Sequence, residues 1–106
     1  MDDVWLIICN CPDATSADAL ATSLVEDGVA ACVNVMTGCA SIYRWRGAVE
    51  RASEVTILIK TTRGKYAKVE SLIRAQHPYE VPEILAIPAV AGLPAYLDWV
   101  RGETLE

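Results

Sequence analysis

Four cysteines and a single histidine are the residues in this 106-residue sequence best suited to bind a metal or to act as a nucleophile. The cysteines are Cys9, Cys11, Cys32 and Cys39, and the histidine is His77. No C-x-x-C pair is present, and a single histidine cannot complete the usual four-ligand zinc patterns within one chain. In a reducing cytosol we expect all four cysteines to remain thiols.

Cys9 and Cys11 are separated by one residue, so on a β-strand their side chains face the same side. Two thiolates with one imidazole suit Cu(I), and Zn(II) less well. The same residues allow plainer interpretations. Cys9 lies in an apolar run and can pack as an inert thiol, and we expect Cys11 to be the more exposed of the two. His77 can cap a helix end, where the dipole favours it, and Cys32 and Cys39 are expected to be packing residues.

A cysteine-dependent enzyme with a Cys–His nucleophile pair is a further interpretation of the same residues. The sequence has no nucleophile elbow, no phosphate-binding glycine loop and no third residue to orient the pair. It therefore predicts a protein that is not an enzyme.

A second group of polar residues lies in a proline-stiffened loop that contains Tyr79, Glu80 and Glu83. Carboxylates are ligands for hard cations, but no recognisable metal-binding loop is present, so we expect only adventitious cation binding there. The rigid loop is predicted to line a cleft between subunits, with Lys60 nearby. Such a cleft would suit a small anionic ligand.

Composition limits the classes of partner. The net charge is −5, from 14 acidic and 9 basic residues, which argues against a nucleic-acid partner because phosphates are bound through clustered lysine and arginine. No apolar run is long enough to span a bilayer, and no signal peptide is recognisable, so we expect a cytoplasmic protein without a membrane partner. Residues 1–106 are predicted to form one domain. Because 53% of the residues are hydrophobic, we expect a second copy of the chain to cover the excess apolar surface.

Hydrophobic periodicity predicts the elements of the first half of the chain. Residues 4–10 are predicted to form a strand that is apolar on both faces. A helix should follow, begun by a capping box formed by Thr15 and Asp18 and ended by Gly28. Two further strands are expected, over residues 31–46 with a bend at Thr37 and Gly38, and over residues 55–61. The residues expected to face inward from the helix are Ala17, Leu20, Ala21, Leu24 and Val25.

The second half is predicted to contain a helix over about residues 65–76, a short edge strand over residues 83–88 between two prolines, and a last helix over about residues 93–100. The expected inward residues are Tyr66, Val69, Leu72 and Ile73 in the first of these helices, and Leu93, Tyr96, Leu97 and Val100 in the second.

The order β-α-β-β-α-β plus a terminal helix indicates an α+β, ferredoxin-like fold with a four-stranded antiparallel sheet. Helices should cover one face of that sheet. The strands at residues 4–10 and 55–61 carry apolar residues on both faces, unlike a sheet that faces water on one side. We therefore expect other subunits to cover the open face. Tyr43 and Trp45 are predicted to lie on a projecting hairpin arm that docks on a neighbour, or else to form an aromatic cluster within the subunit.

Four blocks of sequence resemble the CutA divalent-cation tolerance family: AACVNV at 30–35, SIYRWRG at 41–47, ILIKTT ending at Thr62, and HPYEVPEI at 77–84. The resemblance extends over nearly the whole chain. It implies a ferredoxin-like subunit, a homotrimer whose hairpins pack on neighbours, and a role in tolerance to divalent metal ions, copper in particular. It implies no catalytic activity, and the architecture is similar to that of regulatory signalling trimers.

The resemblance also places copper ligands at the end of the first strand and of the second predicted helix, where Cys9 and His77 match. Gln76 stands where some members have a second histidine, so Cys11 is expected to substitute for that ligand. The sequence thus predicts a trimeric metal-binding protein, with copper ahead of zinc or another divalent cation. The alternative is a regulatory trimer that binds a small metabolite between subunits.

Overall fold

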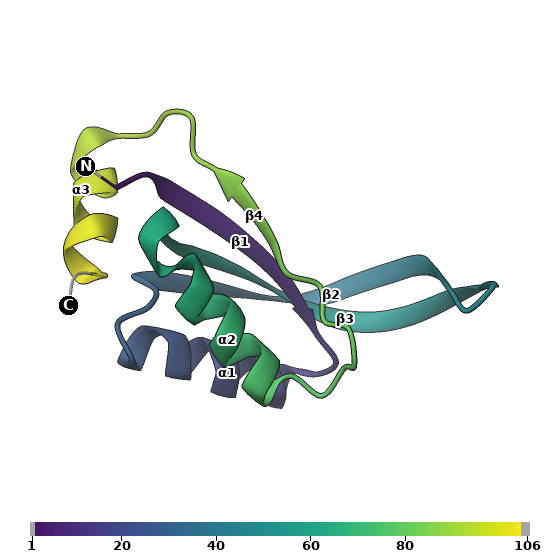
Figure 1. The fold of residues 1–106 in the computed structure, drawn as a ribbon. Helices are drawn as coiled ribbons and strands as arrows, with labels where there is room; N and C mark the ends of the chain where they lie inside the picture. The colour runs from purple at the N-terminus through teal and green to yellow at the C-terminus, as the bar shows by residue number, and fades with distance from the viewer. Residues whose placement is uncertain (1, 105–106) are drawn as a thin grey trace.

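The computed structural model describes residues 2–104 (Figure 1). Its elements run in the order β1 (Val4–Cys11), α1 (Ala14–Glu26), β2 (Cys32–Trp45), β3 (Ala48–Thr62), the 3₁₀ turn η1 (Arg63–Lys65), α2 (Tyr66–Gln76), β4 (Leu85–Pro88) and α3 (Pro94–Glu103). This order confirms the predicted β-α-β-β-α-β arrangement with an added helix. Within residues 2–104, no helix is long and apolar enough to cross a membrane.

The four strands form one antiparallel sheet in the order β2-β3-β1-β4. Helices α1 and α2 lie side by side on one face of that sheet (Figure 1). The short strand β4 occupies an edge, as predicted, and ends in Pro88, which cannot donate to a sheet ladder. Helix α3 lies at the end of the sheet where β1 begins (Figure 1), and the Arg101 Nε donates a hydrogen bond of 2.7 Å to the Asp2 carbonyl oxygen.

The hydrophobic core lies between the sheet and the two long helices. Alternate residues of the central strands point toward the helices and are completely or nearly completely buried, as the side-chain period of two requires. On the helices, Leu24 and Ile73 have no exposed surface. Burying side chains of this size contributes about 1.5–3 kcal/mol each, so this layer dominates the stability of the subunit. The strand residues that build the layer are Ile7, Cys9, Cys11, Val55, Ile57 and Ile59.

The opposite face of the sheet has no helix over it. Leu6, Ile8 and Leu58 lie on this face and are only half buried. Leu85 and Ile87 of β4 pair with Ile8 and Leu6 and are 58% and 47% exposed. The sheet therefore presents apolar side chains on both faces, as the sequence predicted.

The β2–β3 hairpin extends well beyond the rest of the sheet (Figure 1). Strand β1 pairs with β3 only as far as Val55, so residues 39–54, here called the arm, pair only with one another. The predicted bend is confirmed by a register shift between Met36 and Cys39. The arm is the main reason that the molecule is 44 Å long but only 22–26 Å across. A two-stranded ribbon has marginal stability in water by itself.

The start of helix α1 differs from the prediction. The helix begins at Ala14, and its N-cap is Asp13, whose carboxylate accepts the backbone N–H of Ser16 at 2.8 Å. The expected capping box of Thr15 and Asp18 is wrong. Two residues with hydrogen-bonding side chains competed for the cap, and the earlier one, directly after Pro12, formed it.

Several residues that were predicted to face the core are exposed instead, because the buried stripe of each helix is narrower than the sequence pattern indicated. Val25 of α1 is 43% exposed although Leu24 is buried. In α3, which extends to Glu103, Val100 is buried, but Leu93 and Tyr96 are 70% and 41% exposed. The strands differ at their ends as well: β4 begins at Leu85, and β3 already begins at Ala48.

The Asp13 cap gives a pH-dependent prediction. Its hydrogen bonds from the Ser16 N–H and hydroxyl hold the pKa of Asp13 below its ordinary value. A lowered pKa means that the cap stabilises the folded state at neutral pH and loses this contribution as the pH falls through that pKa. Asp13→Ala is expected to lower the melting temperature by a few degrees at neutral pH and by less in strong acid, measured by circular dichroism.

Asp18→Ala is the matched control, because Asp18 is exposed on the same helix and does not form the cap. It should cause little loss at either pH. An equal loss in both variants would refute the assignment of Asp13 as the cap.

Candidate metal site

The structure brings together Cys9, Cys11 and His77, with their ligand atoms all within 4.8 Å of one another. Cys9 and Cys11 lie on the helix-facing side of β1 near its end, and His77 is the C-cap of α2. Because β1 and α2 run in the same direction in this fold, their last residues meet at one end of the molecule. Cys9 is fully buried, Cys11 is 1% exposed and His77 is 9% exposed. The expectation that Cys11 is the more exposed thiol is wrong, since it faces the same core as Cys9.

Hydrogen bonds fix the tautomer of His77. Its Nδ1 accepts the backbone N–H of Tyr79 at 3.1 Å, and an amide can only donate. The proton of the neutral ring is therefore on Nε2, which donates to the Asn10 carbonyl oxygen at 2.7 Å. Histidines that bind metals commonly donate their second ring N–H to a backbone carbonyl in this way. Nδ1 is thus the unprotonated ring nitrogen, and its lone pair is engaged by the Tyr79 amide.

The two thiols of the cluster differ in acidity. The Cys9 thiol donates to the Asn10 carbonyl oxygen at 3.9 Å. Interaction with the neighbouring Cys11 side chain, together with burial, raises the pKa of Cys9. The same interaction between the two side chains lowers the pKa of Cys11. Cys11 is consequently the first of the pair to become a thiolate, which is the form that binds metals.

The remaining predicted residues lie elsewhere. Cys32 and Cys39 are partly buried free thiols outside the cluster. Gln76 is exposed in the last turn of α2. Lys60 points its ammonium at the Asn34 Oδ1 on the open face of the sheet.

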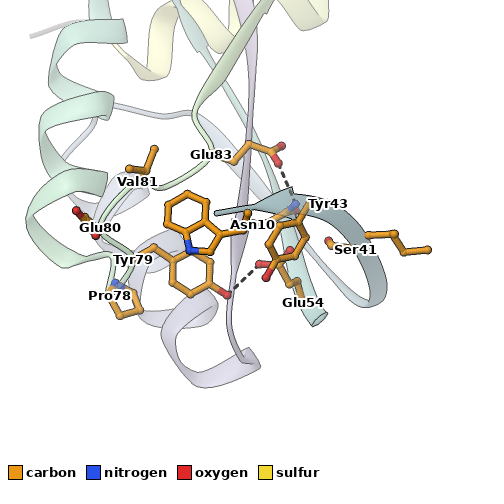
Figure 2. A pocket seen from close by; sticks show the side chains of 11 residues that line it. Asn10, Ser41, Tyr43, Glu54, Pro78, Tyr79, Glu80, Val81 and Glu83 are labelled. Carbon is orange, nitrogen blue, oxygen red and sulfur yellow. Dashed lines mark hydrogen bonds between the residues drawn. The ribbon is translucent and has the colours of Figure 1, made fainter. Parts of the chain in front are cut away.

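A cavity of about 660 Å³ adjoins the cluster, between the arm and the loop that follows His77. Five of the residues predicted to line a cleft do line it, namely Tyr43, Trp45, Tyr79, Glu80 and Glu83. Tyr43 and Trp45 thus line a cavity beside a loop of their own subunit. Figure 2 shows Tyr43, Glu54 and Tyr79 gathered at this cavity.

Three hydrogen bonds organise the cavity wall, and Figure 2 shows those that join Tyr79 to Glu54 and Asn10 to Glu83. The Tyr79 hydroxyl donates to the Glu54 carboxylate at 3.0 Å, and burial together with this bond raises the pKa of Tyr79 to about 12. The Asn10 Nδ2 donates to the Glu83 carboxylate at 3.1 Å, while its Oδ1 accepts the Thr56 hydroxyl at 2.7 Å. Three carboxylates in the lining make the cavity unsuited to the small anionic ligand that the sequence had suggested.

Asn10 and Glu54 are the functional residues that the sequence interpretation passed over. Asn10 orients His77 through its backbone carbonyl and connects β1 to the loop through its side chain. A polar residue between two cysteines in an otherwise apolar strand was the available signal. Glu54 was not singled out, because the sequence does not reveal that Tyr79, in the loop after His77, contacts it.

The fold and the buried cluster define a small ferredoxin-like protein with a soft-metal ligand set where β1 and α2 end. The family model described as CutA1 divalent ion tolerance protein matches residues 5–103, and the chain belongs to that family.

Known relatives agree with this assignment. The chain is 44% identical over 98% of its length to the divalent-cation tolerance protein CutA of Thermus thermophilus, of which it covers 99%. It is also 44% identical, over 85% of its length, to the protein CutA homolog of Xenopus laevis, of which it spans 60%. A solved structure of the Thermus thermophilus divalent cation tolerance protein superposes with a TM-score of 0.94 at 42% identity, covering 95% of this chain and 98% of that one.

Proposed function

We propose that the protein binds copper as Cu(I) through Cys9, Cys11 and His77, and that it contributes to metal tolerance in the cytoplasm by holding the ion as a homotrimer. The observation that carries the proposal is the convergence of two thiols and one imidazole within 4.8 Å. Sulfur ligands with an imidazole favour Cu(I), with Zn(II) next in preference.

The residues present fit the ion chemically. Cys11 supplies the more acidic thiol, and Cys9 gives up its proton when the metal binds, because thiolates rather than thiols are the ligands. The bond from His77 Nε2 to the Asn10 carbonyl holds the ring in place. Either ring nitrogen of His77 must exchange its present hydrogen bond for the ion, Nε2 that to Asn10 and Nδ1 that from Tyr79. Cys11 supplies the third ligand in a chain that has Gln76 in place of a second histidine.

Burial of both thiols supports a binding role rather than a catalytic one. A cysteine nucleophile must reach a substrate, and Cys9 and Cys11 are 0% and 1% exposed. A single metal ion needs far less space than a substrate does.

The proposed trimer rests on the apolar surface that one chain leaves exposed. The arm has no other strand beside it within residues 2–104, and the open face of the sheet carries Leu85 and Ile87 at about half exposure. Exposed apolar areas of this kind are typical of subunit interfaces.

A Cu(I) competition titration against a colorimetric chelator tests the metal site. Cys9→Ala and His77→Ala are each expected to weaken Cu(I) binding on the order of 100-fold, since even outer-shell substitutions cost about 10–100-fold. Cys39→Ala is the matched control, because it removes a thiol that lies outside the cluster. Unchanged affinity in both cluster variants, or an equal loss in Cys39→Ala, would remove the proposed site.

A further inference from the structure

The cavity between the arm and the loop after His77 contains a buried carboxylate without a cation. Glu54 is 8% exposed. Its contact is the hydroxyl of Tyr79, and within residues 2–104 no lysine or arginine forms an ion pair with it. Buried charges in proteins are normally paired or bound to an ion. The positive charge that would complete Glu54 is therefore missing from the subunit.

The other carboxylates of the cavity already have partners. Glu80 forms an ion pair of 3.4 Å with Arg46 at the exposed rim. Glu83 accepts the Asn10 amide and is exposed to water. Glu54 is thus the buried carboxylate of the three, and it lies at the inner end of the arm, where β3 enters the sheet.

Aromatic rings form much of the remaining wall. Tyr43, Trp45 and Tyr79 all line the cavity. The faces of aromatic rings carry partial negative charge and attract ammonium and guanidinium groups, most strongly where water is excluded. The rim provides an example, because the Arg46 guanidinium lies 5.3 Å from the Trp45 ring centroid while it also contacts Glu80.

The combination discriminates between classes of ligand. A bare metal ion prefers several oxygen ligands at once, and the cavity offers one buried carboxylate among aromatic rings. An anion is disfavoured by the three glutamates. A cation with an apolar shell satisfies both the carboxylate and the rings, and a volume of about 660 Å³ lies within the range typical of small-molecule sites.

We infer that this cavity is a binding site for a small organic cation, a quaternary ammonium or protonated amine, held by the Glu54 carboxylate and the rings of Tyr43, Trp45 and Tyr79. None of these four side chains is a ligand in the Cys–His cluster, but Tyr79 contacts His77 through its amide and its ring, so the cavity is tested on metal-free protein.

Isothermal titration of the full, metal-free protein with choline tests the site. The matched ligand is 3,3-dimethylbutan-1-ol, which has the same shape without the charge. Choline is expected to bind at least tenfold more tightly than the alcohol, since a contact with a buried charge contributes about 1.5–3 kcal/mol. Equal binding of the two ligands, or no binding of choline, would overturn the proposal. Choline would also fail to bind if a basic side chain of a second copy of the chain filled the cavity.

Variants locate the binding. Glu54→Gln keeps the shape and the hydrogen bond from Tyr79 but removes the charge, so choline affinity should fall about 10- to 100-fold while affinity for the alcohol stays the same. Glu26→Gln removes an exposed glutamate at the end of α1 and should change neither affinity. Trp45→Leu should weaken the binding of choline more than it weakens the binding of the alcohol. Full choline affinity in Glu54→Gln would place the binding elsewhere and refute the site. If Glu54→Gln fails to fold, the two ligands on the wild-type protein and Trp45→Leu still decide the question.

Discussion

Aspartate at both Ile42 and Val49 is expected to convert the proposed trimer into single chains. The two residues lie on the face of the arm opposite Tyr43 and Trp45, because Ile42 pairs with Arg51 and Val49 pairs with Arg44. They are 58% and 64% exposed, although both are apolar. In an assembly this face would contact a neighbouring subunit. Burying a carboxylate there is unfavourable even opposite an arginine, because removing both charges from water can cost more than their attraction returns.

Light scattering at micromolar concentration provides the measurement. The wild-type protein should give three times the 11.5 kDa mass of one chain, and the double variant should give the mass of one chain. Thr22→Asp, which adds the same charge to the exposed side of α1, should leave the mass at the wild-type value. A wild-type protein that runs as a single chain would refute the assembly, and an intact trimer in the double variant would exclude this face of the arm from the interface.

The fold could be predicted from the sequence wherever one periodicity dominated. The apolar run at residues 4–11, the break at Pro12 and the alternation in Val55, Ile57 and Ile59 gave the correct strands and faces. Helix α2 was predicted closely, because His77 precedes a proline and is held out of the helical region there. The first seven residues of β3 were missed, since the polar sequence of residues 48–54 becomes a strand only by pairing with residues 39–45.

The candidate site could be predicted in part. Topology and family resemblance together paired Cys9 with His77, and their proximity is confirmed by the structure. The alternation of residues shows which face of a strand Cys11 lies on, but not how completely other elements cover the end of that strand. The burial of Cys11 was therefore misjudged. The role of the Asn10 carbonyl could not be predicted, because every residue type has a backbone carbonyl and the sequence does not show which one accepts a hydrogen bond.

The cavity was the least predictable feature. Its lining comes from four separate stretches of the chain, at residue 10, at residues 41–45, at residue 54 and in the loop at residues 78–83. The sequence identified the aromatic and acidic residues but assigned them to a cleft between subunits. Which side of a two-stranded ribbon faces its own subunit depends on the twist of the whole hairpin. That twist follows from the register shift at residues 36–39, a bulge whose effect on direction is not encoded in periodicity.

Helix α1 provides the sharpest comparison between pattern and packing. Leu24 and Val25 both fit the apolar stripe of a helix, yet Leu24 is fully buried and Val25 is 43% exposed. Leu24→Ala is expected to lower the free energy of unfolding by about 2–5 kcal/mol, because it removes buried methyl groups and leaves a cavity beneath the sheet. Val25→Ala should change it by less than about 0.5 kcal/mol, since exposed substitutions are usually nearly neutral.

Urea unfolding followed by circular dichroism measures the free energy of unfolding of both variants. All samples need the same protein concentration, because association adds to apparent stability. If the packing of Leu24 stabilises the subunit, the loss in free energy of unfolding should be much larger for Leu24→Ala than for Val25→Ala. Losses of similar size would mean that Val25 becomes buried in the assembly, and that the outer side of α1, rather than the open face of the sheet, contacts a neighbour. The same measurement therefore tests how α1 packs and which surface the oligomer uses.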